Sequence, residues 1–143
     1  WLDGIKSTAK QFDNVKIVGQ VYTSDDAAKA LPQVNALLTA HPDITDIATH
    51  MGTTTPGAVA AIRAKHRKGK TFIVVGGHDN GGTEAIEDGY ARSMLLQDVC
   101  GLGKDMVNGV IDVAEGKEAA TVPVRVAVVD EDEIQALLDD GWV

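Results

Sequence analysis

The chain has 143 residues, of which 44% are hydrophobic and only 4% aromatic, and its formal net charge at pH 7 is −8. This length suits a single domain with an aliphatic core, and the acidic balance argues against nucleic acid as a partner, because nucleic-acid binders carry basic patches. No apolar run approaches the roughly 18 residues of a membrane span, and a single cysteine, Cys100, excludes an internal disulfide.

The first residues predict a helix, since Leu2, Ile5 and Ala9 fall close to helical spacing. The chain opens with neither an initiator Met nor a signal peptide. We therefore expect it to be part of a longer protein. The next segment, "VKIVGQVY" (15–22), is rich in Val and Ile and predicts a strand.

A helix is predicted next, because apolar side chains recur at helical spacing through residues 27–38. Ser24 is the expected N-cap, with acidic residues behind it in the first turn. Pro32 interrupts this pattern, so it either kinks the helix or stands in the first turn of a shorter one.

The middle of the chain alternates strand and helix. "ITDIATH" (44–50) predicts a strand, and the following segment predicts a helix with a Thr N-cap, Pro56 at its first position and Gly69 at its end. "TFIVV" (71–75) predicts a third strand. It is apolar on both faces, as expected for a strand that helices cover on both sides.

The alternation continues to the C-terminus. A short helix near "GTEAIEDG", a strand at 90–96 and a long amphipathic helix at 98–116 follow the glycine-rich loop. A last strand, "TVPVRVAVV" (121–129), precedes a helix with an acidic start. The pattern predicts an α/β fold, a three-layer sandwich with a mainly parallel sheet.

That topology gathers polar side chains at one edge of the sheet. In an open parallel sheet, ligands bind beyond the carboxyl ends of the strands. The residues expected there have mixed donor and acceptor groups, which suit a neutral polyhydroxylated ligand: His50, Thr53, Thr54, His78, Asp79, Asn80 and Gln97. The glycines of "GGHDNGG" let the backbone come close. Alternatively, Asp79 and Asn80 only form a turn or cap the next helix.

Several ordered motifs carry a resemblance that covers nearly the whole chain: "HPDI", "GTTTPGAVAAI", "VVGGHDN", "AIEDGYARSMLLQDVCGLGKDMVNGVID" and "VPVRVAVVD". Together they resemble the C-terminal part of a type I periplasmic substrate-binding protein, the sugar receptor of an ABC importer. The resemblance implies that residues 1–143 form a flavodoxin-like C-terminal lobe whose N-terminal lobe is absent. It further implies a periplasmic location, a sugar or similar small polar ligand, and a membrane permease as partner of the full-length protein. LacI-like repressors share the fold, so a repressor effector domain remains an alternative.

The resemblance also implies which residues bind the ligand. An Asp after the third strand of the family matches Asp79, and a Gln at the end of the next strand matches Gln97, near a hinge crossing. Where the family usually has Asn, this chain has Met51, which implies a less hydroxylated ligand face. His78, Asn80 and Thr53 complete the expected ligand-binding set.

The long helix after "QD" packs on the first lobe in proteins of this type. In this chain its apolar stripe, which includes Val99, Leu102, Met106 and Val110, would face water. We therefore expect a homo-oligomer formed by exchange or mutual covering, a helix that swings back onto its own sheet, or cover by the missing lobe. With only half of the site, we expect weak or no sugar binding by this chain alone.

Other function classes stay open at this point. His50, His78 and Asp79 are suitable metal ligands, and Asp79 beside His78 could do acid–base chemistry. The chain has no nucleophile elbow and no Walker motif, so we expect no catalytic residues, no metal and no cofactor. A phosphate-accepting receiver module would use Asp25 and Asp26 near the end of the 15–22 strand, and the glycine-rich loop could cradle an anion.

Overall fold

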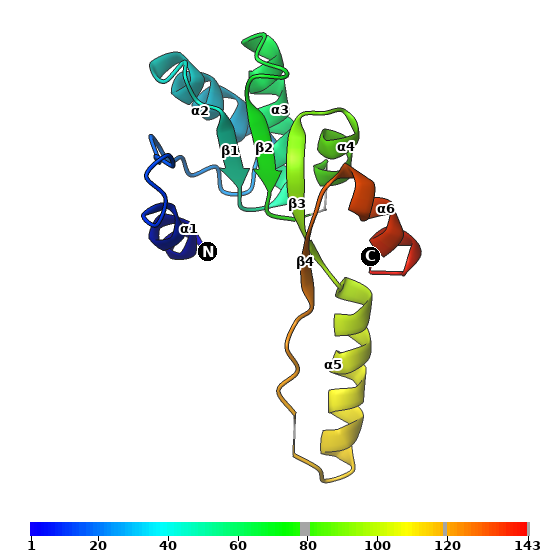
Figure 1. The fold of residues 1–143 in the computed structure, drawn as a ribbon. Coiled ribbons are helices and arrows are strands. Elements are labelled where there is room, and N and C mark those ends of the chain that lie inside the picture. Colours follow the sequence, from blue (N-terminus) through cyan, green and yellow to red (C-terminus); the bar gives the residue numbers. More distant parts are fainter. Residues whose placement is uncertain (78–80, 119, 143) are drawn as a thin grey trace.

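The computed structural model describes residues 1–77, 81–118 and 120–142 (Figure 1). Its strands form one sheet in the order β1-β2-β3-β4. Their bounds are Asp46–Thr49 for β1, Phe72–Val75 for β2, Ala91–Gln97 for β3 and Val126–Val129 for β4. The first three strands are parallel, and β4 is antiparallel to β3. The predicted α/β class with a mainly parallel sheet is confirmed.

The helices that bury side chains in the core pack on one face of this sheet. They are α2 (Ala27–Ala40), α3 (Thr55–Ala64), α4 (Gly82–Glu87) and α6 (Glu131–Asp139). Alternation along the strands turns the fully buried side chains of Ile73, Val75, Met94 and Leu96 toward them. These strand residues join Val34, Ile62, Ile86 and Ile134 from the helices in one aliphatic core. Because the chain has few aromatic residues, the core is filled mainly by closely packed aliphatic side chains.

The opposite face of the sheet is open. Val74 alternates with the buried Ile73 and Val75 but is 39% exposed, and Val128 of β4 is 68% exposed. The expectation that helices cover residues 71–75 on both sides is therefore wrong for the described part of the chain. The apolar pattern of β2 indicated burial on both faces, but no described helix packs over the second one.

The predicted strand at 15–22 is also not formed. This segment joins no ladder in the structure, and Val15 and Ile17 are about half exposed. It runs instead along α2, where Gly19 lies against Leu37 and the Gln33 Nε2 donates to the Tyr22 carbonyl at 3.0 Å. A strand needs a hydrogen-bonding neighbour, and the outer edge of β1 has no strand beside it among the described residues.

Helix boundaries follow capping rather than periodicity alone. Asp26, not Ser24, is the N-cap of α2, because its Oδ1 accepts from the backbone N–H of Ala28 at 2.8 Å. Ser24 and Asp25 adopt left-handed conformations before it. Pro32 lies inside α2 without ending it.

The other predicted boundaries shift by a few residues. α3 has a Thr, Thr54, at its N-cap position as predicted, although no Thr54 side-chain hydrogen bond caps the helix, and Pro56 stands at its second position rather than the predicted first. It ends at Ala64, well before Gly69. The first helix, α1, spans Leu2–Ala9 as expected and buries none of its residues. No helix in the described ranges is both long and apolar enough to cross a membrane.

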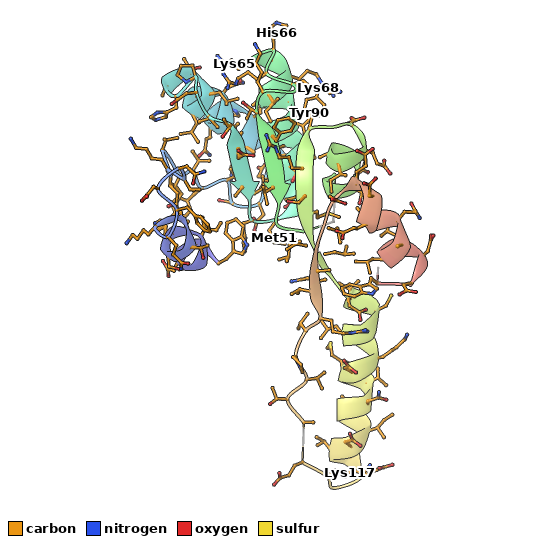
Figure 2. The ribbon with its side chains drawn as sticks, in the orientation of Figure 1. Met51, Lys65, His66, Lys68, Tyr90 and Lys117 are labelled. Carbon is orange, nitrogen blue, oxygen red and sulfur yellow. The ribbon has the colours of Figure 1, made fainter. Side chains whose placement is uncertain are left out.

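Residues 98–118 and 120–128 form a projection that we call the arm (Figure 1). It contains α5 (Val99–Ala114), the chain that returns alongside it and most of β4. At its base the Asp98 Oδ1 accepts from the Gly101 N–H at 2.6 Å, and the Asp98 carboxylate pairs with Arg125. At its tip the Lys117 ammonium donates to the carboxylates of Glu115 and Asp112, at 2.9 Å from each, and these hydrogen bonds raise the pKa of Lys117 (Figure 2).

The arm exposes many apolar side chains to solvent. Gly101 is the only residue of α5 that is buried. Its exposed large apolar side chains are Val99, Leu102, Met106, Val107, Val110, Ile111 and Val113 on the helix, with Val122, Val124, Val126 and Val128 on the returning chain. The helix does not swing back onto the sheet, which was one of the expected arrangements.

The two faces of the sheet predict different responses to the same substitution in β2. Val75→Ala removes two methyl groups from the core and is expected to lower the free energy of unfolding by about 2 kcal/mol. Val74→Ala, on the open face, is expected to cost less than about 1 kcal/mol. Urea denaturation followed by circular dichroism measures both, and equal losses would contradict a sheet that is covered on one face.

Candidate functional site

The carboxyl ends of β1 and β2 stop at the same level. Thr49 pairs with Val75, so the chain leaves these strands side by side at His50 and Gly76. β3 continues further, because Met94 is the partner of Val75 and the strand runs three residues beyond it to Gln97. At the rise of an extended strand, Gln97 therefore lies about 10 Å past the ends of β1 and β2.

Close backbone packing explains the glycines around the loop after β2. A Cβ on Gly76 would collide with the carbonyl oxygens of Thr49 and His50, so the two strand exits pass each other in direct contact. Gly81 has φ +111° and lies against Pro56, and Gly82 lies against the carbonyl of Gly77. These positions need a residue without a side chain, for steric or conformational reasons.

Three of the predicted site residues, His78, Asp79 and Asn80, lie outside the described residues. Their assignment to ligand binding, to a turn, to a metal or to acid–base chemistry stays a prediction. In the ranges that the structure covers, no group of three or more His, Cys, Asp or Glu side chains is placed to hold a metal ion.

Met51 and Thr53 follow the end of β1, as predicted: Met51 directly precedes the short helix η1 (Gly52–Thr54), and Thr53 lies within it. Met51 is half-buried at the lower edge of the sheet in Figure 2. The Thr53 Oγ1 is buried and has no hydrogen-bond partner among the described residues. The hydroxyl of Thr54, by contrast, donates to the Met51 carbonyl at 2.9 Å and is used inside the fold.

Gln97 is exposed at the end of β3, next to the base of the arm. Its side chain follows that of Leu96 by one residue and so points to the open face of the sheet. The adjacent Asp98 is buried, caps α5 and pairs with Arg125. The two residues of "QD" thus have different roles. The Gln97 amide has no hydrogen-bond partner among the residues that the structure describes and can donate to and accept from a ligand, whereas the Asp98 carboxylate positions the arm.

One residue near the edge was not predicted from the sequence. The Trp1 indole packs edge-on against the His50 imidazole, with ring centroids 5.1 Å apart, and remains 51% exposed. This places apolar aromatic surface beside the polar strand ends. No local pattern signals the contact, because it joins residues 49 positions apart in the chain.

Two surface hollows of the described residues lie away from the edge, one between α3 and α4 and one beside α1. Neither is lined by Met51, Thr53 or Gln97. The groups that the structure describes at the edge are an amide, a hydroxyl, a thioether and two aromatic rings, which together can hydrogen-bond to and make apolar contact with a small polar molecule.

Comparison with known proteins agrees with the fold. The sequence family described as periplasmic binding protein domain matches residues 1–118. No curated protein matches the chain.

Solved structures give close matches at low sequence identity. An ABC transporter solute-binding protein from Agrobacterium vitis with bound D-fucose is 22% identical with a TM-score of 0.86, covering 98% of this chain and 49% of that one. A second from Agrobacterium vitis, bound with α-D-tagatopyranose, is 14% identical with a TM-score of 0.87, covering 99% and 48%. One from Burkholderia graminis, in complex with D-arabinose, is 23% identical with a TM-score of 0.84, covering 94% and 48%. The chain thus spans about half the length of these proteins.

The packing at Gly76 generates a stability prediction. Gly76→Ala is expected to lower the free energy of unfolding by about 1–3 kcal/mol, because the added methyl group pushes the exits of β1 and β2 apart. The matched control is Gly109→Ala in α5, where a Cβ meets open space and stability is expected to rise by up to about 1 kcal/mol. Thermal and urea unfolding of both variants measure the difference. A Gly76→Ala protein as stable as wild type would refute the close approach.

Proposed function

Because the chain belongs to the periplasmic binding protein domain family, we propose that it is one lobe of an extracytoplasmic receptor for a sugar or a similar small polar molecule. The observation that carries the proposal is the likeness over 98% of the chain to about half of a solute-binding protein that holds D-fucose. In the full-length protein the receptor delivers its ligand to the membrane permease of an ABC importer.

Three uncovered surfaces support the proposal that this chain is the C-terminal lobe of a protein with two lobes. The outer edge of β1 has no neighbouring strand in the described ranges, although segment 15–22 has the composition of one. The second face of the sheet exposes Val74 and Val128, and the arm exposes apolar side chains along its whole length. An N-terminal lobe would cover such surfaces, since apolar patches of this kind mark interaction sites.

The ligand would lie between the strand-end edge and the second lobe. Gln97 extends past the strand-end edge beside the arm. Its amide can reach a hydroxyl group of a ligand that lies at the junction of the two lobes. Met51 and Trp1 provide apolar contact, and the Thr53 hydroxyl lacks a described partner. Asp79 with His78 and Asn80, in the loop that Gly76 and Gly81 flank, would supply the remaining hydrogen bonds.

The role is binding rather than catalysis. The described edge offers no pairing of a nucleophile with a base, which covalent catalysis requires. The receiver alternative loses its acidic strand end, because Asp26 caps α2 and segment 15–22 forms no strand. The solved structures named above are solute-binding proteins, so no observation favours the repressor alternative.

Ligand binding by this chain is expected to be weak and centred on Gln97. One lobe contributes only part of the hydrogen bonds and excludes little water, so dissociation constants in the millimolar range are expected for a panel of pentoses, hexoses and polyols. NMR signals of the side-chain amides can be used to follow binding. The chemical shift of the Gln97 side-chain amide should change with sugar concentration and reach a plateau. The chemical shifts of Gln33 and Gln135, whose side chains are hydrogen-bonded elsewhere, should not change.

Calorimetry on two variants tests the same point. Gln97→Ala should weaken the binding of the sugar that moves the Gln97 signal by about 10-fold, whereas Gln11→Ala, on an exposed segment away from the sheet, should leave it unchanged. Tight binding by this chain alone would contradict the half-site, and a panel in which no sugar moves the Gln97 signal would contradict the ligand class.

The arm is expected to make this chain self-associate in the absence of a covering lobe. Val110→Asp removes an apolar side chain that is 71% exposed on α5 and should raise the dimer dissociation constant by about 10-fold or more. Asn108→Asp adds the same charge to the same helix without removing apolar surface and is the control. Sedimentation velocity over a range of concentrations measures both, and a monodisperse wild-type monomer with α5 exposed would overturn the expectation.

A further inference from the structure

A strongly basic segment stands at the opposite end of the sheet from the candidate site. Residues 63–70, "RAKHRKGK", hold five of the 13 Lys and Arg residues in a chain whose net charge is −8. The segment comprises the last two residues of α3 and most of the connection to β2, so it lies at the amino end of β2. We call residues 63–70 the basic tip, and Figure 2 shows Lys65, His66 and Lys68 together there, far from Met51.

The backbone of the tip is held in one conformation by Arg67. Its Nε donates to the Thr71 Oγ1 at 2.7 Å, and its terminal nitrogens donate to the carbonyls of Ile44, at 2.8 Å, and Pro42. The Arg67 carbonyl accepts from the Thr71 N–H at 3.0 Å, and His66 before it adopts a left-handed conformation with φ 51°. The Arg67 side chain is thus used inside the fold, and its hydrogen bonds position the segment that carries the other basic residues.

Tyr90 contacts two more cations of the tip, Arg63 and Lys68. Its ring is buried, and its hydroxyl accepts from the Arg63 Nε at 3.2 Å. The ammonium of Lys68 lies 4.9 Å from the ring centroid, in the geometry of a cation–π contact. The hydrogen bond to Tyr90, with a smaller contribution from Asp88, raises the pKa of Arg63. Both positive charges are therefore kept at the same end of the molecule.

The exposed charges of the tip are not neutralised by ion pairs within the fold. The side chains of Arg63, Lys65, His66, Lys68 and Lys70 are exposed, and the ion pairs among the described residues use other cations. The tip also presents no large exposed apolar side chain. Protein interfaces are built around an apolar or aromatic centre and are depleted in lysine, so a lysine-rich, apolar-free surface fits a polyanion instead.

We propose that the basic tip docks this protein on a membrane surface through anionic phospholipid headgroups. Clusters of four to eight basic residues are what anionic lipid surfaces attract, and an extracytoplasmic receptor, as proposed above, works next to such a surface. The acidic remainder of the chain is repelled by the lipid, so the tip faces the membrane. The strand-end edge and its ligand lie at the opposite end and stay accessible.

Vesicle co-sedimentation tests the proposal without any sugar, so its outcome is independent of ligand binding. The chain is mixed at low salt with vesicles of phosphatidylglycerol and phosphatidylcholine in equal parts, or of phosphatidylcholine alone. Each basic side chain at an anionic surface changes the partition coefficient about five-fold. The triple variant Lys65→Gln, Lys68→Gln and Lys70→Gln should therefore bind the anionic vesicles about 100-fold less well. Arg63 and Arg67 are left intact because they support the fold.

The control carries the same loss of charge elsewhere. Lys6→Gln, Lys10→Gln and Lys104→Gln together replace three exposed lysines and should lower vesicle binding by less than about five-fold. Wild-type binding should also disappear at high ionic strength and on pure phosphatidylcholine. Equal losses of vesicle binding in the two triple variants would overturn the proposal. Wild-type protein that does not bind anionic vesicles would also overturn it, even if the basic tip could be crosslinked to an acidic protein partner.

Discussion

The structure depends on the hydrogen bonding of β3 along both of its edges. β2 pairs with its first half in parallel, and β4 pairs with its second half in the antiparallel direction. Because the two partners meet β3 at different heights, the strand runs from the body of the fold into the arm. Met94 and Leu96 anchor it in the core at no solvent exposure, while Gln97 and Asp98 carry it past the strand-end edge. The position of the candidate site and the direction of the arm both follow from this one strand.

Charge and polarity are distributed unequally along the molecule. One end of the sheet carries a neutral set of hydrogen-bonding and apolar groups around Met51, Thr53 and Gln97, which suits an uncharged polar ligand. The other end concentrates positive charge on a loop that Arg67 and Tyr90 hold in place. Between them lies an aliphatic core that is closed on one face only. These features give the chain a core that is covered on one face and three separate surfaces: the strand-end edge, the open apolar side with its arm, and the basic tip.

Much of the local structure was predictable, because it depends on neighbours in sequence. Apolar periodicity and capping or turn residues located the six α-helices of the described residues, although not the short helix η1, and apolar runs located all four strands. Most of the predicted ends are within two residues, but β4 begins five residues later than predicted and α3 ends well before Gly69. The errors have specific causes. The helix at residue 27 is capped by Asp26 rather than Ser24, since only Asp26 places an oxygen against the N–H of Ala28. Segment 15–22 has strand composition but no partner strand, and the second face of β2 is apolar but uncovered. Of the candidate site, Gln97 ends β3 and Met51 and Thr53 follow the end of β1, while their role in ligand binding stays a prediction. The contact between Trp1 and His50 has no local signature.

The sequence by itself determined the α/β class, the order of the elements and the residues that follow the parallel strands, because these depend on periodicity and on the geometry of parallel sheets. Only the tertiary structure decided which apolar surfaces are covered, how far Gln97 stands from the edge, and that Gly76 is required by contact with the carbonyls of Thr49 and His50. It also decided that Arg67 serves the fold while its basic neighbours face solvent. The burial of a side chain and the groups that it contacts depend on how the whole chain packs. They therefore cannot be determined from the neighbouring residues in the sequence.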